Sequence, residues 1–190
     1  ARAIISANVL SDIARLSDSE NAGEIDLTIA DNHIYFTTKS MSCFSRLIDG
    51  QYYPYEQVIR KVFSSSARVP TESLLRASLR AAIVASEEDR AMRIILSKEA
   101  GTLTVKAGSA EKGRMEETVP AIITGEDVEI WVQHRYILQA LERIGSEDTF
   151  IGISGLVSPM KLEPVEDKEG NAVVEATYVV MPMSSPKGTF

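Results

Sequence analysis

The chain has 190 residues, of which 44% are hydrophobic and 25% are charged, and these proportions are ordinary for a globular protein with one or two cores. Its formal net charge of −7 argues against a conventional nucleic-acid-binding protein, although local basic strips remain compatible with it. Cys43 is the only cysteine, which excludes an intrachain disulfide and fits a reducing compartment, and no apolar run is long enough to span a bilayer.

Three amphipathic helices are predicted to begin near Ala7, Thr71 and Gln133, at intervals of about 60 residues. Pro70 and Thr71 are start signals for the second helix, and Gly145 closes the third. The residues that we expect on the buried stripes are Val9, Ile13 and Leu16 in the first helix, Leu75, Leu79 and Ala82 in the second, and Ile137, Ala140, Leu141 and Ile144 in the third. Leu10 and Ile83 are expected at the edges of the first two stripes.

Strand-like runs separated by turn residues follow each helix. They cover residues 25–30, 34–38 and 41–48 after the first helix, 92–97 and 103–106 after the second, and 150–154, 160–162 and 172–181 after the third. A helix followed by antiparallel strands, repeated along the chain, predicts an α+β fold in which each helix covers one face of a sheet.

Two helix-plus-strands units make a compact domain, so three units leave one unpaired. The pattern is interrupted at Ser64-Ser65-Ser66, and we therefore expect residues 1–62 to be half a domain and residues 63–190 to be a complete one. The chain starts without Met, inside a strand-like Ala3-Ile4-Ile5 run, which suggests a fragment or a processed product.

The residues that usually carry catalysis are not arranged for it. The sequence has no Gly-rich phosphate loop, no Gly-x-Ser-x-Gly elbow and no His-Glu-x-x-His pair. His33 and His134 have no Cys or carboxylate at ligand spacing, and Cys43 falls in a strand-like run as a small core residue. We therefore predict a protein that is not an enzyme and that uses neither a metal nor a cofactor.

Two segments resemble a known family. One is Leu47-Ile48-Asp49-Gly50-Gln51-Tyr52-Tyr53-Pro54-Tyr55, and the other is Tyr178-Val179-Val180-Met181-Pro182-Met183 near the C-terminus. Both are similar to the bacterial DNA polymerase III beta subunit, the sliding clamp, in which the first segment ends the middle domain and the second is the last strand. The resemblance covers essentially the whole chain, which would correspond to the second half of the middle domain and the entire last domain.

The resemblance implies a DNA-clamp fold and a non-catalytic function. Clamps are bacterial, cytoplasmic, nucleoid-associated processivity factors that encircle duplex DNA without reading its sequence. They tether DNA polymerase subunits, the clamp loader and repair proteins, which insert short peptide motifs with Leu and Phe anchors into a groove. The family ring is a head-to-tail homodimer, and a chain without the first domain is not expected to close it.

The resemblance places the partner-peptide groove at Tyr53, Pro54, Gln57, Val58, Val179, Val180, Met181, Pro182 and Met183. Val179 and Met181 are two residues apart and so point to the same side of a strand, although a plain core strand would show the same pattern. This sequence has Tyr53 where the family has its proline and Gln57 where it often has a basic residue, and residues 184–190 extend beyond the usual end.

Two further sets of residues follow from the resemblance. Arg15, Arg76, Arg80 and Arg135 lie off the apolar stripes and would face DNA in a clamp, although the residues alone favour an ordinary polar helix surface. Ile83, Val84, Glu116 and Glu117 would face the next subunit, with ordinary core and an exposed strand edge as the alternatives. For the whole chain, the alternatives are a stand-alone peptide-binding adaptor and a small enzyme with a cleft between its units.

Overall fold

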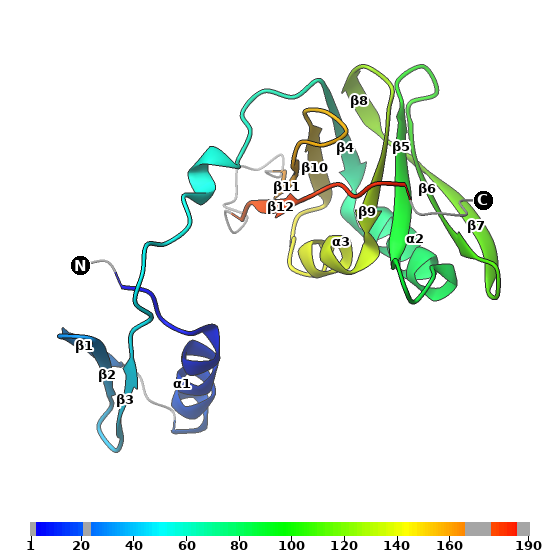
Figure 1. Cartoon of the computed structure of the whole chain (residues 1–190). Helices are drawn as coiled ribbons and strands as arrows, with labels where there is room; N and C mark the ends of the chain where they lie inside the picture. The colour runs from blue at the N-terminus through cyan, green and yellow to red at the C-terminus, as the bar shows by residue number, and fades with distance from the viewer. Residues whose placement is uncertain (1–2, 21–23, 166–175, 186–190) are drawn as a thin grey trace. The chain divides into compact units, whose positions relative to one another are not determined.

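The computed structural model describes residues 3–20, 24–165 and 176–185 of the chain. It divides into two compact units, Ala1–Pro54 and Tyr55–Phe190 (Figure 1). Within the described residues, no helix combines the length and the apolar character needed to cross a membrane.

The first unit is one helix and a three-stranded antiparallel sheet. Its elements are α1 (Ala7–Glu20), β1 (Asp26–Ala30), β2 (His33–Thr37) and β3 (Ser42–Arg46), and the strand order is β1-β2-β3. Ile13 of α1 packs with Ile34 and Phe36 of β2 in a small core, to which half-buried Val9 and Cys43 add contacts. Leu10 and Leu16 remain exposed, so the predicted stripe of this helix is wrong for Leu16.

The core side of β1 is uncovered within this unit. Leu27 and Ile29 are in register with buried Phe36 and Ile34, and yet 62% and 43% of their surfaces are exposed. Side chains opposite each other across a strand pair point to the same face of the sheet, so both residues point to the core side. The single helix fills the core only at β2 and β3, so the core side of β1 stays exposed within this unit.

The second unit holds two sheets and two helices. It begins with the short 3-10 helix η1 (Tyr55–Gln57), β4 (Ser65–Pro70) and α2 (Thr71–Val84). The elements that follow are β5 (Ala91–Ser97), β6 (Thr102–Ser109), β7 (Gly113–Pro120), β8 (Ile122–Gly125), β9 (Val128–Gln133), α3 (His134–Leu141), β10 (Asp148–Ile153), β11 (Met160–Pro164) and β12 (Tyr178–Val180). One sheet has the order β12-β11-β10-β4-β8 and the other β7-β6-β5-β9.

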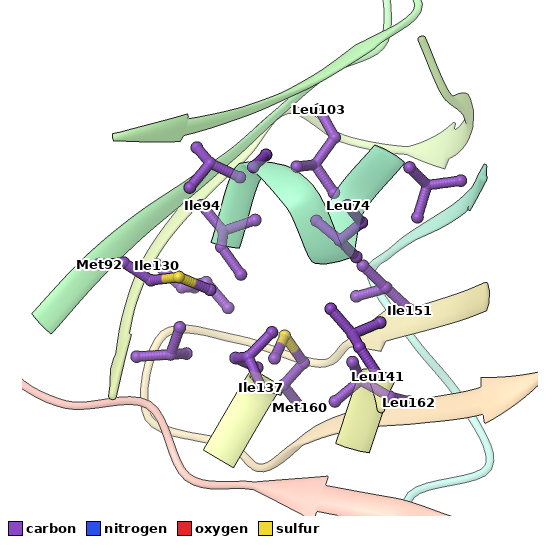
Figure 2. Close-up of a cluster of buried hydrophobic side chains, with 14 of the residues drawn as sticks. Leu74, Met92, Ile94, Leu103, Ile130, Ile137, Leu141, Ile151, Met160 and Leu162 are labelled. Carbon is purple, nitrogen blue, oxygen red and sulfur yellow. The ribbon is translucent and has the colours of Figure 1, made fainter. Parts of the chain in front are cut away.

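The core of the second unit lies where α2 and α3 pack on the two sheets. The two helices contact each other, and Leu74 of α2 and Ile137 and Leu141 of α3 are fully buried with strand residues such as Ile94 and Ile151. Figure 2 shows these side chains pointing toward one another from both sheets. Each such side chain contributes about 1.5–3 kcal/mol when it leaves water, so this unit has a core sufficient for an independent domain. The predicted α+β fold is confirmed.

The predicted helix starts at Ala7 and Thr71 are confirmed, and α3 begins one residue after the predicted Gln133. The stripe of α3 is also confirmed, but the predicted stripe of α2 is only partly right, because half-buried Leu75 packs against the core and Leu79 does not. Its buried residues are Thr71, Leu74, Ala77, Ser78 and Ala81, whereas Leu79 is exposed. The helix is apolar on more than one side, and Leu74 faces the core together with the small residues Ala77, Ser78 and Ala81.

The interruption expected at Ser64-Ser65-Ser66 is instead the start of β4, a strand inside the five-stranded sheet. Its serines find backbone partners: Ser64 Oγ donates to the carbonyl oxygen of Ile153 at 3.1 Å, and Ser65 Oγ donates to that of Glu126 at 2.6 Å. These bonds make it possible to bury polar residues in the sheet. The sequence pattern also missed β7, β8 and β9. The compact units divide after Pro54, while the domain boundary after residue 62 stays a prediction.

Candidate functional site

The last strand presents one residue to the core and its neighbours to the surface. Strand β12 is the edge of the five-stranded sheet and pairs with β11, with Val179 opposite Lys161 and Val180 opposite Met160. Val180 is only 4% exposed and belongs to the core, whereas Val179 is 37% and Met181 is 57% exposed. The strand therefore serves both as a core strand and as a surface, because alternate side chains point to opposite faces.

The segment after β12 joins the edges of the two sheets. The backbone N–H of Met183 donates to the carbonyl oxygen of Trp131 at 2.8 Å, and the two residues form an antiparallel bridge. Trp131 lies on β9, the edge strand of the four-stranded sheet. Figure 1 shows the segment, in red, running from β12 toward β9 and β5. Exposed Met181 is thus held between two anchored points.

Helix α3 adds an aromatic residue that the sequence analysis did not single out. It contacts both β9 and β12, and its exposed side carries Tyr136. Ile137, Ala140 and Leu141 face the core, so Tyr136 lies off the apolar stripe. An exposed aromatic residue immediately before a buried stripe is the signal that could have revealed it.

Five residues after Val58, the chain reaches the outer face of the five-stranded sheet at Phe63 and Ser64. Phe63 lies against Gly152, and Ser64 N donates to the carbonyl oxygen of Ile153 at 2.9 Å. Gly152 is in register with Lys161, which is in register with Val179. With strands about 4.8 Å apart, Phe63 contacts the same row of the sheet about 10 Å from Val179.

Lys161 links this row to the aromatic residues beside it. Its ammonium lies 5.4 Å from the centroid of the Phe63 ring and 5.9 Å from that of Phe150, and it pairs with Glu163 at 2.7 Å. Val58 is half-buried and Gln57 is exposed in the same compact unit. Tyr53 and Pro54 are exposed and belong to the first unit.

Three of the four arginines predicted to face DNA have acidic partners on the protein itself. Arg15 pairs with Asp12 at 2.9 Å, Arg76 pairs with Glu72, and Arg80 donates two hydrogen bonds to Glu117. Arg135 is exposed, and no ion pair is recorded for it in the described part of the chain. Since paired charges attract phosphate less strongly, these helices present a weaker basic surface than the count of arginines suggests.

The residues predicted to face the next subunit lie on neighbouring elements, because α2 contacts β7. Ile83 on α2 is 69% exposed, which rules out the core alternative for it, whereas Val84 packs against the core. Glu116 on β7 pairs with Lys106 at 2.7 Å. The hydrogen bonds between Arg80 and Glu117 raise the pKa of the arginine and lower that of the glutamate. A residue predicted to face DNA is thus bound to one predicted to face a subunit.

His134 lies at the start of α3, where its backbone and its ring have structural surroundings. Its backbone N–H donates to the carbonyl oxygen of Arg90 at 3.0 Å, and its Nδ1 is buried without a hydrogen-bond partner. Burial, and secondarily the positive charge of Arg90, lower the pKa of His134, so the imidazole is neutral at pH 7. His33 lies in the other unit, and the described residues include no group of three His, Cys, Asp or Glu placed to hold a metal ion.

Comparison with known proteins shows which protein family this chain is similar to. Residues 56–184 match the family model of the DNA polymerase III beta subunit, C-terminal domain. The beta sliding clamp of Synechococcus elongatus is 34% identical over 139 residues, which cover 73% of this chain and 36% of the relative. That of Proteus mirabilis is 30% identical over 172 residues, covering 90% and 45%. The chain spans less than half the length of these relatives.

Solved structures agree with the sequence comparison. The crystal structure of the DNA polymerase sliding clamp from Pseudomonas aeruginosa matches with a TM-score of 0.83 and 27% identity, covering 96% of this chain and 48% of that one. A structure of the clamp from the same organism bound to griselimycin matches with a TM-score of 0.82, at 27% identity and covering 96% and 47%. The fold is the DNA-clamp fold, and the chain belongs to the DNA polymerase III beta subunit family.

Proposed function

We propose that this chain is part of a sliding clamp that encircles duplex DNA and tethers polymerase subunits, the clamp loader and repair proteins by a short peptide in each partner. It acts in the bacterial cytoplasm and catalyses no reaction of its own. The ring is proposed for the longer homodimeric protein, because the relatives are about twice as long as this chain.

The observation that carries the proposal is the exposed apolar segment Val179–Met183. It offers Val179 and Met181 to solvent while Val180 and Met183 are fixed to the protein. An apolar surface that is already ordered loses little conformational freedom when a partner binds, so a short peptide can gain useful affinity from a few buried anchors. Methionine also adapts to anchors of different shape, which suits a surface with several partners.

Further predicted groove residues complete this proposal. Gln57 ends η1 and Val58 follows it, in the unit that contains the last strand, and Tyr136 lies on the helix that contacts that strand. Tyr53 and Pro54 stay predicted groove residues. Arg15, Arg76, Arg80 and Arg135 stay predicted DNA-facing residues, with Arg135 the strongest of them because no acidic partner is recorded for it in the described part of the chain. Ile83, Val84, Glu116 and Glu117 stay predicted interface residues.

The test is fluorescence polarisation of a labelled Gln-Leu-x-Leu-Phe peptide titrated with this chain. We expect saturable binding in the micromolar range, about −8 kcal/mol, and a loss of about tenfold for Met181→Ala. Ile122→Ala is the matched control, because Ile122 is an equally exposed apolar residue on β8, at the opposite edge of the same sheet. A peptide with its three apolar residues replaced by Ala should not bind. Equal affinity in wild type and Met181→Ala would refute the assignment of the site.

A further inference from the structure

The end of the candidate groove is anchored by a backbone hydrogen bond and not by a strand. Pairing of β12 with β11 stops at Val180. The next recorded bond of the backbone is that from Met183 N–H to the carbonyl oxygen of Trp131, at 2.8 Å. Only Met181 and Pro182 lie between these two points. Pro182 has a fixed φ and no N–H, so few torsions remain free in this span.

Trp131 is unusually well covered for its position. Its neighbours Ile130 and Val132 face the core, so its side chain points to the opposite, outer face of the four-stranded sheet. It is nevertheless only 8% exposed. Arg93, in register on β5, places its guanidinium 5.6 Å from the centre of the indole ring, and Glu129 forms an ion pair with Arg93.

The pairing of β9 with β5 fixes the backbone that accepts the bond. Trp131 is paired with Arg93 on one side of β9 and with Met183 on the other. The acceptor is therefore rigid before any partner binds. Because Met183 is half-buried beside it, the N–H is also sheltered from competing water.

We infer that the Met183–Trp131 hydrogen bond is a latch that positions Met181 and Pro182 for the partner peptide. This inference rests on the proposed peptide-binding function. Without the bond, the chain beyond Val180 would sample many conformations, and a binding peptide would have to order it. Met183 then acts through its backbone as a positioning residue, while Arg93 lies over the Trp131 ring on the acceptor strand and Glu129 pairs with Arg93.

Two substitutions at one position separate the backbone from the side chain. Met183→Pro removes the N–H donor, whereas Met183→Ala removes most of the side chain and keeps the donor. In the same polarisation assay on the whole chain, we expect Met183→Pro to weaken peptide binding by about tenfold or more, and Met183→Ala, which loses a predicted groove side chain but keeps the N–H, to weaken it by a clearly smaller factor. Trp131 is the only tryptophan, so its emission should shift to longer wavelength in Met183→Pro alone.

The outcomes are distinguishable. Equal affinities of Met183→Pro and wild type, with Met181→Ala still weakened, would overturn the latch and leave the groove intact. An equal loss in both Met183 variants would assign the effect to the side chain and also overturn the latch. A wild-type chain that does not bind the peptide would overturn the proposed function and the latch together.

Hydrogen exchange of the Met183 amide gives a second measurement that does not depend on the folding of a variant. We expect this amide in the wild-type chain to be protected relative to that of exposed Ser184, and to become better protected when the peptide is added. An unprotected Met183 amide would overturn the latch, even if Met183→Pro failed to fold.

Discussion

Phe63 occupies the space that a side chain at position 152 would need. A Cβ placed on Gly152 would lie 2.6 Å from Cδ1 and from Cε1 of the Phe63 ring, and 2.8 Å from Cζ. Carbon atoms pack at about 3.5–4.0 Å, so Gly152→Ala must push the ring away by roughly 1 Å. The ring cannot move freely, because it packs edge-on against Phe150 at 5.6 Å and lies under Lys161.

These contacts set the expected loss of stability. Because Phe63 is only half-buried and therefore not enclosed on every side, we place Gly152→Ala in the lower part of the overpacking range, at about 1–2 kcal/mol. Phe63→Ala gives up the edge-on ring pair and the cation–π contact, which together also contribute about 1–2 kcal/mol. In the double variant the overlap is gone, so the combined loss should be about 1 kcal/mol smaller than the sum of the two single losses.

The assay is urea unfolding followed by the fluorescence of Trp131, which lies in the same compact unit. Gly145→Ala is the control, because no atom lies within 4 Å of a Cβ at that position. Additive losses in the double variant, or a Gly152→Ala chain as stable as wild type, would show that Phe63 does not rest on Gly152.

Three further outcomes are expected. Leu74→Ala should lower the free energy of unfolding by about 2–5 kcal/mol, and Leu79→Ala by no more than about 0.5 kcal/mol, because Leu74 is buried in the core and Leu79 is exposed. Similar losses for the two variants in urea unfolding would show that Leu79 also faces the core, as the sequence pattern predicted. The lowered pKa of His134 means that the unfolded chain takes up protons first as the pH falls. Stability measured by thermal unfolding should therefore be complete above about pH 6.5 and decline below it, and His134→Gln should remove that part of the decline. Light scattering should give a mass below that of a closed dimeric ring, and a ring-sized dimer would contradict the prediction.

The sequence predicted correctly those elements whose apolar periodicity is clear from neighbouring residues alone. Helix α3 has one apolar stripe, and the four residues expected on it are all buried, although the helix ends at Leu141 and Ile144 lies beyond it. Helix α2 could not be placed in the same way, because Leu75 and Leu79 compete with Leu74 for the core. Which leucine becomes buried depends on which small residues allow the helix to approach α3 and the strands, and that is decided only when the whole unit packs.

Strand β4 shows a second limit of local patterns. A run of three serines has low strand propensity. The carbonyl oxygens that accept hydrogen bonds from the Ser64 and Ser65 hydroxyls belong to Ile153 and Glu126, which are far along the chain. The candidate site shows the same division. The motif Met181-Pro182-Met183 was visible in the sequence, whereas the acceptor for Met183 could be found only once β9 was placed beside it.

The short length of β12 connects stability to the proposed function. An edge strand exposes backbone groups that can pair with other chains, and natural sheets limit this by ending such strands early and by placing proline on them. Here pairing stops at Val180, and Pro182 has no N–H to offer to a further strand. A longer β12 would keep Val179, Met181 and Met183 on one face of the sheet and would not turn toward β9. The break that limits edge pairing is therefore also what turns the chain so that Met183 can reach Trp131, and it leaves Met181 exposed for a partner.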